Sequence, residues 1–321
     1  MTEETPETLY TLWRDPRSPL RWDCLFALPP WLRSWERTVG CGTSWVRAFW
    51  AGAQPVGVAP LLRDGDAARF LGSPDLCDYG DLVLAPGWGE AVGAALLGHL
   101  EESGVRLLEL AGLRPDAVAR GSLPVAAEAA GWTVAWEPDG VSVGLELPGS
   151  WEAFLERLGK KERHEVRRKL RRLEDAGDVQ VRRVGAEAPV GEAIEVFLRL
   201  FAGYRRDKEI FLTPERRAFF AEVIGATARE GLLDLAFLEL DGNPVAGVLC
   251  FVHGGTTYLY NNGYDPAWEH LSAGTLSKVL SIRESIERGA LRYDLLRGGE
   301  AYKLRLGGQP VPLARCRLSR P

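Results

Sequence analysis

Residues 256–303 read TTYLYNNGYDPAWEHLSAGTLSKVLSIRESIERGALRYDLLRGGEAYK, which contains a β-rich run, a loop, an amphipathic helix, a short strand and a Gly pair. The helix opens on the small-residue step Ser272-Ala273-Gly274-Thr275. A helix start of this kind presents backbone N–H groups without helical partners, together with the positive end of the helix dipole. Both features favour a phosphate group or another anion. We therefore expect a pocket for a phosphate-bearing ligand beside a strand in this part of the chain.

An earlier segment resembles the one that leads into this stretch. Residues 45–62 (WVRAFWAGAQPVGVAPLL) and 235–251 (LAFLELDGNPVAGVLCF) each contain a strand, a Gly-containing turn and a second strand that begins near a Pro. Turns of this composition predict β-hairpins. A β-rich run, a helix and a strand follow each hairpin, at residues 78–84, 88–103 and 106–110 in the first half and at residues 256–261, 272–288 and 292–296 in the second.

This repeated order predicts two copies of one α/β unit. The junction is expected at Leu-Pro-Gly-Ser, residues 147–150, so that the units span residues 1–148 and 149–321. The first copy's helix begins at Pro-Gly-Trp-Gly, residues 86–89, and lacks the hydroxyl side chains of the second. We therefore expect only the C-terminal unit to bind the phosphate-bearing ligand.

Composition narrows the class of protein. The chain has 321 residues, of which 46% are hydrophobic, so it can bury a sizeable core. A formal net charge of −5 gives no support to DNA binding, which usually needs a basic face. Five scattered cysteines without a Cys-x-x-Cys pair predict reduced thiols, a cytoplasmic location and no metal site. The sequence has no signal-peptide pattern and no apolar run of about 18 residues, so we expect no membrane span.

A strongly basic segment precedes the second copy's hairpin. Residues 160–172 (KKERHEVRRKLRR) place eight basic residues in one predicted helix. Such a helix is either a solvated surface, in which Glu162 and Glu165 pair locally, or a wall that faces an anion. Arg163 and Arg167 are four residues apart, so they share a face of the helix and could clamp one phosphate.

Three stretches of this chain together resemble the GNAT superfamily of acyl-CoA-dependent N-acyltransferases. They are residues 160–173 (KKERHEVRRKLRRL), 260–280 (YNNGYDPAWEHLSAGTLSKVL) and 293–308 (YDLLRGGEAYKLRLGG). The resemblance covers about residues 33–308 and is greatest to the tandem-GNAT branch, which contains the CelD-like proteins associated with cellulose synthesis and the Fem-type aminoacyltransferases. The step at residues 272–275 departs from the Gln/Arg-x-x-Gly-x-Gly/Ala pyrophosphate loop of ordinary GNAT enzymes. This leaves the donor open, because Fem-type relatives use aminoacyl-tRNA.

The resemblance implies an α/β fold of two tandem GNAT-like units, each a mixed, mostly antiparallel sheet flanked by helices. It also implies an enzyme that transfers an acetyl or longer acyl group from acyl-CoA to an amine, without a metal. The acyl chain and pantetheine arm would lie between two separating strands, at residues 248–252 and 258–262. The expected donor-binding residues are Val248, Leu249, Cys250, Ser272, Ala273, Gly274 and Thr275.

Acyl transfer needs a neutral amine, a polarised carbonyl and, in many enzymes, a positioned base. Asp294 ends a predicted strand beside a Gly-rich turn, where it could act as the base, hold Lys303 or cap the turn. His270 precedes the anion-binding step by two residues and could act as a base or make a local hydrogen bond. Asp81, in the first copy, could receive the amine or stabilise a turn. The expected substrate-binding residues are Arg163, Arg167, Tyr79, Asn261, Asn262, Tyr264, Tyr302 and Lys303.

The sequence leaves three functions open. The first is an acyl-CoA N-acyltransferase that acts on a small molecule, an amino sugar or a cell-envelope precursor. The second is a Fem-type transferase that uses aminoacyl-tRNA to build peptidoglycan bridges. The single basic helix at residues 151–176, in place of two long coiled-coil arms, argues against tRNA as the partner. The third is a non-catalytic binding module. The acceptor, the acyl chain and the oligomeric state do not follow from the sequence.

Overall fold

The computed structural model describes residues 1–184, 190–203 and 206–320. Contacts divide the chain into two compact units, one made of Met1–Val141 with Val311–Pro321 and the other of Ser142–Pro310. The boundary expected from the sequence, after residue 148, lies seven residues beyond the observed boundary after Val141. The sequence also placed the last residues of the chain in the second unit. They belong to the first because β13 (Gln309–Ser319) pairs there with β6 (Leu107–Leu113).

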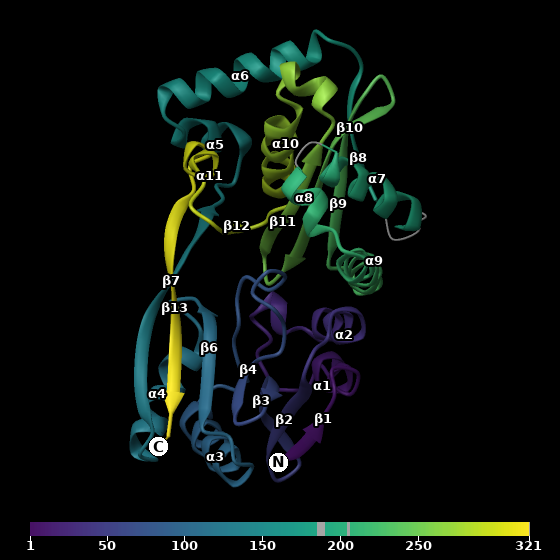
Figure 1. Ribbon diagram of the computed structural model, residues 1–321. Coiled ribbons are helices and arrows are strands. Elements are labelled where there is room, and N and C mark those ends of the chain that lie inside the picture. Colours follow the sequence, from purple (N-terminus) through teal and green to yellow (C-terminus); the bar gives the residue numbers. More distant parts are fainter. Residues whose placement is uncertain (185–189, 204–205, 321) are drawn as a thin grey trace. The chain divides into compact units, whose positions relative to one another are not determined.

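The second unit is a mixed sheet in which neighbouring strands are antiparallel except for one parallel pair, β11 and β12 (Figure 1). The β9–β10 hairpin turns at Asp241 and Gly242, whose φ angles of 50° and 77° suit a type I′ turn. The strands lie in the order β8 (Val179–Arg183), β9 (Leu233–Leu240), β10 (Asn243–His253), β11 (Thr256–Tyr264), β12 (Arg292–Arg297) and the end of β7 (Thr133–Glu146).

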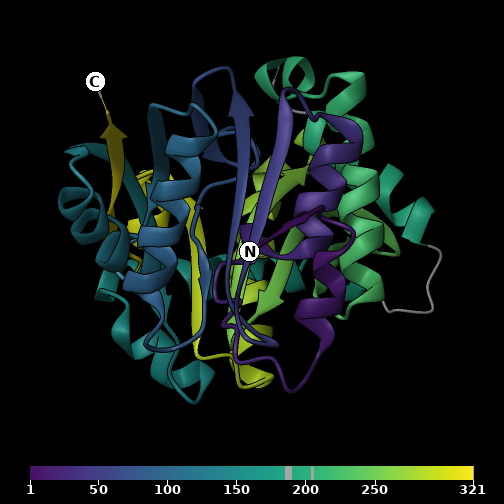
Figure 2. The same cartoon turned by 90° about the horizontal axis from the view of Figure 1, so that it is seen from below.

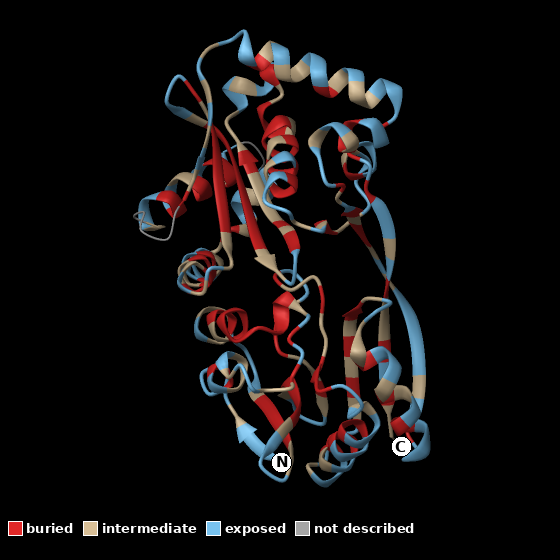
Figure 3. Ribbon diagram, turned by 180° about the vertical axis from the view of Figure 1, so that it is seen from behind, coloured by how far each residue is buried: buried red, intermediate tan, exposed pale blue. Residues whose placement is uncertain are grey.

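Helices cover both faces of this sheet. Val248 of β10 packs in a core cluster with Val279 and Ile282 of α10, whereas its neighbour Gly247 faces Phe197 of α7. Successive strand residues point to opposite faces, so α10 and α7 lie on opposite sides of the sheet. Figure 3 shows β9 and β10 buried along most of their length. The helices of this unit are α5 (Trp151–Arg157), α6 (Lys160–Glu174), α7 (Val190–Ala202), α8 (Arg206–Phe211), α9 (Pro214–Arg229), η2 (Pro266–Leu271), α10 (Ala273–Glu287) and α11 (Ala301–Arg305).

The first unit has the same order of strands and the same directions. Its parallel pair is β4 and β6, and the strands before β4 are antiparallel as they are before β11. Figure 2 shows these strands between α3 on one side and α1 and α2 on the other. The remaining elements of this unit are β1 (Thr2–Glu4), β2 (Thr43–Ala51), β3 (Gln54–Asp64), β4 (Ala67–Phe70), β5 (Val83–Leu84), α1 (Leu9–Arg14), η1 (Leu25–Ala27), α2 (Pro29–Thr38), α3 (Gly89–Glu102) and α4 (Val118–Ala129).

The predicted mixed α/β fold with two tandem units is therefore confirmed, with one correction to the repeat. Residues 78–84 were expected to be the counterpart of 256–261. Only Val83–Leu84 of that segment is a strand, and it pairs with β3 instead of with β6. The true counterpart of β11 is the short strand β4, whose sequence Ala-Ala-Arg-Phe carries a weaker β-pattern.

Gly263 of β11 marks the closest approach of a helix to the sheet. A Cβ at this position would overlap the backbone of Leu200 and Phe201 in α7. We expect Gly263→Ala to lower the free energy of unfolding by about 2–3 kcal/mol, since backbone atoms cannot move aside as a flexible side chain can. Urea unfolding would measure this change. The matched control is Gly98→Ala in α3, where a new Cβ meets nothing within 4 Å and a gain of roughly 0.5–1 kcal/mol is expected. Equal effects of the two substitutions would contradict this packing.

Candidate active site

The parallel strands β11 and β12 separate partway along their length. Their pairing joins Thr256 to Arg292 and ends where Tyr258 meets Asp294. β11 continues to Tyr264, while β12 turns away at Leu296, which has a φ of 62°. Within the described chain, the later residues of β11 thus form an edge that β12 does not cover. We call residues 259–264 the open edge of β11.

The separation was expected between other strands, residues 248–252 and 258–262, and that expectation is wrong. β10 and β11 stay paired from Ala246 and Tyr264 to His253 and Thr256, with one irregularity beside Leu249. The reason is connectivity. A tight turn at Gly254 and Gly255 joins β10 to β11, whereas η2 and α10 lie between β11 and β12. A two-residue hairpin holds its strands together, and a long crossover lets parallel strands diverge.

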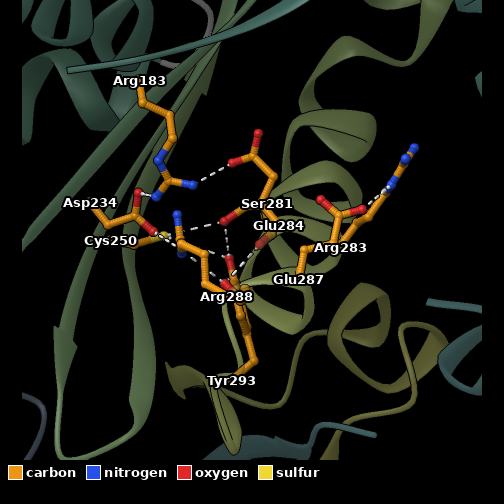
Figure 4. Close-up of polar contacts among 10 residues, drawn as sticks. Arg183, Asp234, Cys250, Ser281, Arg283, Glu284, Glu287, Arg288 and Tyr293 are labelled. Atoms are coloured by element: carbon orange, nitrogen blue, oxygen red, sulfur yellow. Dashed lines mark hydrogen bonds and ion pairs between the residues drawn. The ribbon is translucent and has the colours of Figure 1, made fainter. Parts of the chain in front are cut away.

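Val248, Leu249 and Cys250, predicted to bind the donor, are buried within the paired part of β10. The Cys250 sulfur lies 3.7 Å from the Ser281 hydroxyl and 3.6 Å from the Tyr293 hydroxyl (Figure 4). Desolvation raises the pKa of the Cys250 thiol to about 11, so it is protonated at neutral pH. In the structure Val248 and Cys250 belong to the core cluster beneath α10, and Leu249 is buried in the same strand.

The first turn of α10 has backbone amides to offer a ligand. The amides of Thr275 and Leu276 donate to the Ser272 carbonyl, at 2.9 and 3.0 Å. The two amides before them, at Ala273 and Gly274, precede the helical hydrogen-bond ladder. A Cβ on Gly274 would lie 2.8 Å from Cε1 of Tyr264, so the absence of a side chain lets the tyrosine ring pack on the helix start.

Arg172 brings a positive charge from α6 to this helix start. Its Nη2 donates to the Ser272 hydroxyl at 3.0 Å. Its Nε is buried and has no acceptor among the described residues. A cation at a helix N-terminus is opposed by the helix dipole, and a buried N–H without an acceptor is rare in folded proteins. A bound anion would resolve both conditions.

Most of the other basic residues of α6 are exposed. Arg163 is half-buried and Arg167 exposed, and neither makes an ion pair with another described residue. Arg168 and Lys169 pair with Glu165, at 2.8 and 3.4 Å. The hydrogen bond from Arg168 lowers the pKa of Glu165 to about 2. The local pairing foreseen for this helix thus exists for part of it, and the Arg163–Arg167 pair stays a candidate phosphate contact.

Two lysines lie in this region, Lys208 on the open edge of β11 and Lys278 at the start of α10. From α8, the Lys208 ammonium donates to the Asn262 carbonyl at 2.5 Å and lies 4.4 Å from the Phe201 ring centroid. From α10, the Lys278 Nζ donates to the Gly274 carbonyl and lies 5.0 Å from the Tyr302 ring centroid. Lys278 is only 7% exposed. Desolvation, followed by the charge of Lys208, lowers its pKa to about 7.

The residues predicted to act as bases in this unit have local roles. Asp294 is buried, and its Oδ1 accepts a hydrogen bond from the Leu296 amide at 2.8 Å, which stabilises the turn that ends β12. His270 is exposed on η2, with Nδ1 3.1 Å from the Ala267 carbonyl oxygen. These contacts match the capping and local hydrogen bond that the sequence also allowed. A catalytic role for either residue stays a proposal without support from these contacts.

Lys303 was expected to contact a phosphate, but in the structure its ammonium is bonded to backbone carbonyls and to Glu300. It is 2% exposed, and its ammonium donates to the carbonyls of Leu296, Arg297 and Gly298 at 3.3, 2.7 and 3.0 Å. It also forms an ion pair with Glu300 at 2.9 Å. All three donor hydrogens are engaged, so Lys303 fixes the chain between β12 and α11. Its neighbour Tyr302 is half-buried and faces Lys278.

Tyr79 and Asp81 lie in the first unit, at the place that corresponds to the open edge. The Gly80 amide donates to the Gly112 carbonyl of β6 at 3.4 Å, and Gly80 packs on the Phe70 ring of β4. The chain around Tyr79 thus occupies the space where β4 and β6 separate. Asp81 accepts hydrogen bonds from the Val118 and Ala119 amides, both at 2.9 Å, and caps α4. Desolvation raises the pKa of Asp81 to about 7 against these bonds.

Arg172, Lys208 and Lys278 did not emerge from the sequence. A signal existed for Lys278, because Gly274, Lys278 and Ile282 are spaced four residues apart and share one helix face. Both neighbours are small or apolar, so this lysine lies in the buried stripe. Arg172 resembled the other cations of α6, and nothing in the local pattern of Lys208 distinguishes it.

Within the described residues, no group of three or more His, Cys, Asp or Glu side chains could hold a metal ion. None of the helices in that part of the chain has both the length and the hydropathy to span a bilayer.

Comparison with known proteins identifies a domain family for part of the chain. Residues 160–304 match the model of the acetyltransferase (GNAT) domain. A search of curated proteins finds no match. The crystal structure of FemX has a TM-score of 0.66 at 14% identity, over 98% of this chain and 97% of that chain. A conserved protein of unknown function from Bacteroides thetaiotaomicron has a TM-score of 0.60 at 15% identity, over 99% of each chain. The C-terminal domain of a putative lysylphosphatidylglycerol synthetase from Agrobacterium fabrum has a TM-score of 0.56 at 11% identity, over 85% of this chain and 83% of that chain.

The resemblance to the GNAT superfamily is confirmed by the family match, which begins at α6 and ends within α11. At these low identities the solved structures show a shared fold and nothing of the substrate. The fold shared with FemX extends over nearly the whole chain, including the first unit, which lies outside the family match.

Proposed function

We propose that this chain, whose residues 160–304 belong to the GNAT domain family, transfers an acyl group from acyl-CoA to an amine. The acceptor class is a small molecule, an amino sugar or a cell-envelope precursor. The strongest support for the proposal is the start of α10, which follows the open edge of β11 after the short helix η2. This helix start offers an anion two backbone amides and Arg172, whose Nε is buried without an acceptor among the described residues. The parallel strands that separate lie in the same unit.

In this proposal the phosphates of the donor bind the amides of Ala273 and Gly274 and the guanidinium of Arg172. The amide-bearing arm of the donor lies along the open edge of β11, where backbone groups of Asn261 and Asn262 are candidate partners. The acyl group then lies further along the open edge, toward the point where β11 and β12 separate after Tyr258 and Asp294. Holding donor and acceptor together in this way can supply about 7–11 kcal/mol of the barrier reduction.

Donor binding is assigned to the second unit alone. In the first unit the segment around Tyr79 already fills the space between β4 and β6, and Tyr79 itself is 5% exposed beneath Arg114. A donor arm could enter there only by displacing this packed segment. The first unit is therefore proposed to support the fold or the acceptor and not to bind acyl-CoA.

A second candidate function is transfer from aminoacyl-tRNA. It is favoured by α6, on which Lys160, Lys161, Arg167 and Arg171 are all exposed. A row of cations along a helix of 15 residues is suited to a phosphodiester backbone, whose binding is strongly salt-dependent. The fold shared with FemX is compatible with this candidate.

Thermal-shift measurements with acetyl-CoA, a longer acyl-CoA and charged tRNA separate these candidates, because a ligand that binds only the folded state raises the melting temperature. We expect Arg172→Met to weaken acetyl-CoA binding by about 10–100-fold, the value of one charge-assisted hydrogen bond of about 1.5–3 kcal/mol. The matched control is Arg168→Met, which removes an exposed cation of the same helix that already pairs with Glu165.

The control variant should bind acetyl-CoA as the wild type does. Equal loss in both variants would show that α6 acts only through its total charge, and the site at the start of α10 would be wrong. A larger shift with charged tRNA than with either acyl-CoA would favour the second candidate. No shift with any of the three ligands would favour a non-catalytic binding module.

A further inference from the structure

The exposed side of α6 is basic over its first three turns. Every exposed residue between Lys160 and Arg171 is a lysine, an arginine or a histidine, and the two carboxylates in this stretch, Glu162 and Glu165, are only half-exposed. We call these exposed residues the basic face of α6; they are Lys160, Lys161, His164, Arg167, Arg168 and Arg171. Of these, Arg168 alone forms an ion pair with another described residue.

The packing of α6 does not account for these charges. The buried residues of the helix, Val166 and Leu173, point into the core clusters beneath it. Like charges three or four residues apart, such as those of Arg167 and Arg171, destabilise a helix. The basic face therefore opposes the stability of α6, and its concentrated positive charge is suited to an anionic partner.

The basic face ends beside the proposed donor site. The residue after Arg171 is Arg172, whose Nη2 donates to the Ser272 hydroxyl at 3.0 Å, at the start of α10. Leu173 of α6 and Leu276 of α10 belong to one core cluster, which fixes the two helices against each other. Figure 1 shows α6 lying across this end of α10. A partner that covers the basic face is thus placed next to the proposed phosphate-binding amides.

The extent of the basic face limits the kind of partner. From Lys160 to Arg171 the helix rises about 16 Å, which equals roughly three turns of a partner helix. Exposed carboxylates follow at once, at Glu174 and Asp175. The net charge of the whole chain is −5, so acidic residues predominate outside α6. A nucleic acid, which needs a broader basic surface, would meet these carboxylates. A compact acidic protein matches the basic face in both charge and length.

We propose that the basic face of α6 docks an acidic protein that carries the acyl group as a thioester on a phosphopantetheine arm. This inference rests on the proposed function, because it assigns a carrier to the same donor site. The phosphate of the arm binds at the start of α10 beside Arg172, and the arm lies along the open edge of β11. The acceptor nitrogen bonds to the acyl carbon, the carbon–sulfur bond breaks, and the sulfur takes the proton that the nitrogen loses.

Binding of an acyl carrier protein with an acetyl-phosphopantetheine arm, followed by fluorescence anisotropy, tests the docking. We expect Lys160→Glu/Lys161→Glu to weaken this binding by about 10–100-fold, because each substitution turns an attraction into a repulsion. Glutamate in the first turn is favoured by the helix dipole, so the melting temperature of this variant should not fall. The matched control is Arg217→Glu/Arg229→Glu on α9, which reverses two exposed arginines that pair with no described residue. The control should bind the carrier as the wild type does.

A second comparison tests whether the basic face and the donor site bind the same partner. The carrier with its acetylated arm and the same carrier without an arm are measured against each variant. Arg172→Met should weaken binding of the carrier with the arm only, because Arg172 contacts the phosphate. Lys160→Glu/Lys161→Glu should weaken binding of both forms, because the basic face contacts the carrier itself.

Several results would overturn the proposal. One is full carrier binding by Lys160→Glu/Lys161→Glu, and another is an equal loss in the α9 control. Tighter binding of tRNA, or of phosphatidylglycerol vesicles, than of the carrier would assign the basic face to a different partner. A thermal shift with acetyl-CoA but no binding of the carrier would contradict the docking alone. Absence of that shift, with equal binding of the two carrier forms, would instead contradict the proposed function.

Discussion

Replacing Asp234 with Asn is expected to lower the free energy of unfolding by about 3–5 kcal/mol, because it leaves two guanidinium groups without their shared buried partner. Asp234 lies on β9 and is 6% exposed. One of its oxygens forms an ion pair with Arg183 and the other with Arg288 at 2.6 Å. Arg183 also pairs with Glu284 of α10 at 2.6 Å (Figure 4), so this cluster fastens α10 to the sheet.

Urea unfolding at neutral pH would measure this loss, and a second ion pair of α10 provides the control. Arg283 and Glu287 are four residues apart, 2.8 Å from each other and about half exposed. Glu287→Gln removes a surface ion pair and should change the free energy of unfolding by less than about 0.5 kcal/mol. If the two substitutions cost the same, the buried cluster does not fasten α10 in the way the contacts indicate.

Replacing Lys278 with Met is expected to stabilise the protein at neutral pH, by on the order of 4 kcal/mol. Burial lowers the pKa of Lys278 from 10.5 to about 7. Between these values the unfolded chain binds a proton that the folded chain does not, so the wild-type stability rises with pH across this window. The penalty is complete below about pH 7 and absent above about pH 10.5. Methionine has a similar shape and no charge, so it should not incur the penalty.

The measurement is the free energy of unfolding of both proteins by urea between pH 6 and pH 10. The wild-type curve should rise relative to that of Lys278→Met and approach it at the alkaline end. Parallel curves would contradict the lowered pKa of Lys278. Lys208→Ala should reduce the gap between the curves, because it removes the cation that adds to the effect of burial.

Much of the fold could be read from local pattern. Turn residues and hydrophobic spacing, which act within a few residues, predict the hairpins, the helix at residues 272–288 and the repeat. The counterpart of β11 was missed because β4 is four residues long and its role depends on its pairing with β6. Which strands separate was also missed, because it follows from the path of the chain between them.

The candidate site was only partly readable for the same reason. The start of α10 is a continuous stretch of sequence, so its anion-binding character is visible in the residue types. Lys303 and Lys278 are both lysines near this site, and only tertiary contacts distinguish them. Lys303 is held by three carbonyls and Glu300, whereas Lys278 lies beside Tyr302 with another lysine as its charged neighbour. Arg172 becomes notable only once α6 packs against α10.

A crystal structure of the full chain with acetyl-CoA bound would test the donor site most directly. The expected result is one donor per chain, with its pyrophosphate on the amides of Ala273 and Gly274 and beside Arg172, and its acyl group along the open edge of β11. A donor bound between β4 and β6 of the first unit, or a pyrophosphate placed away from the start of α10, would contradict it.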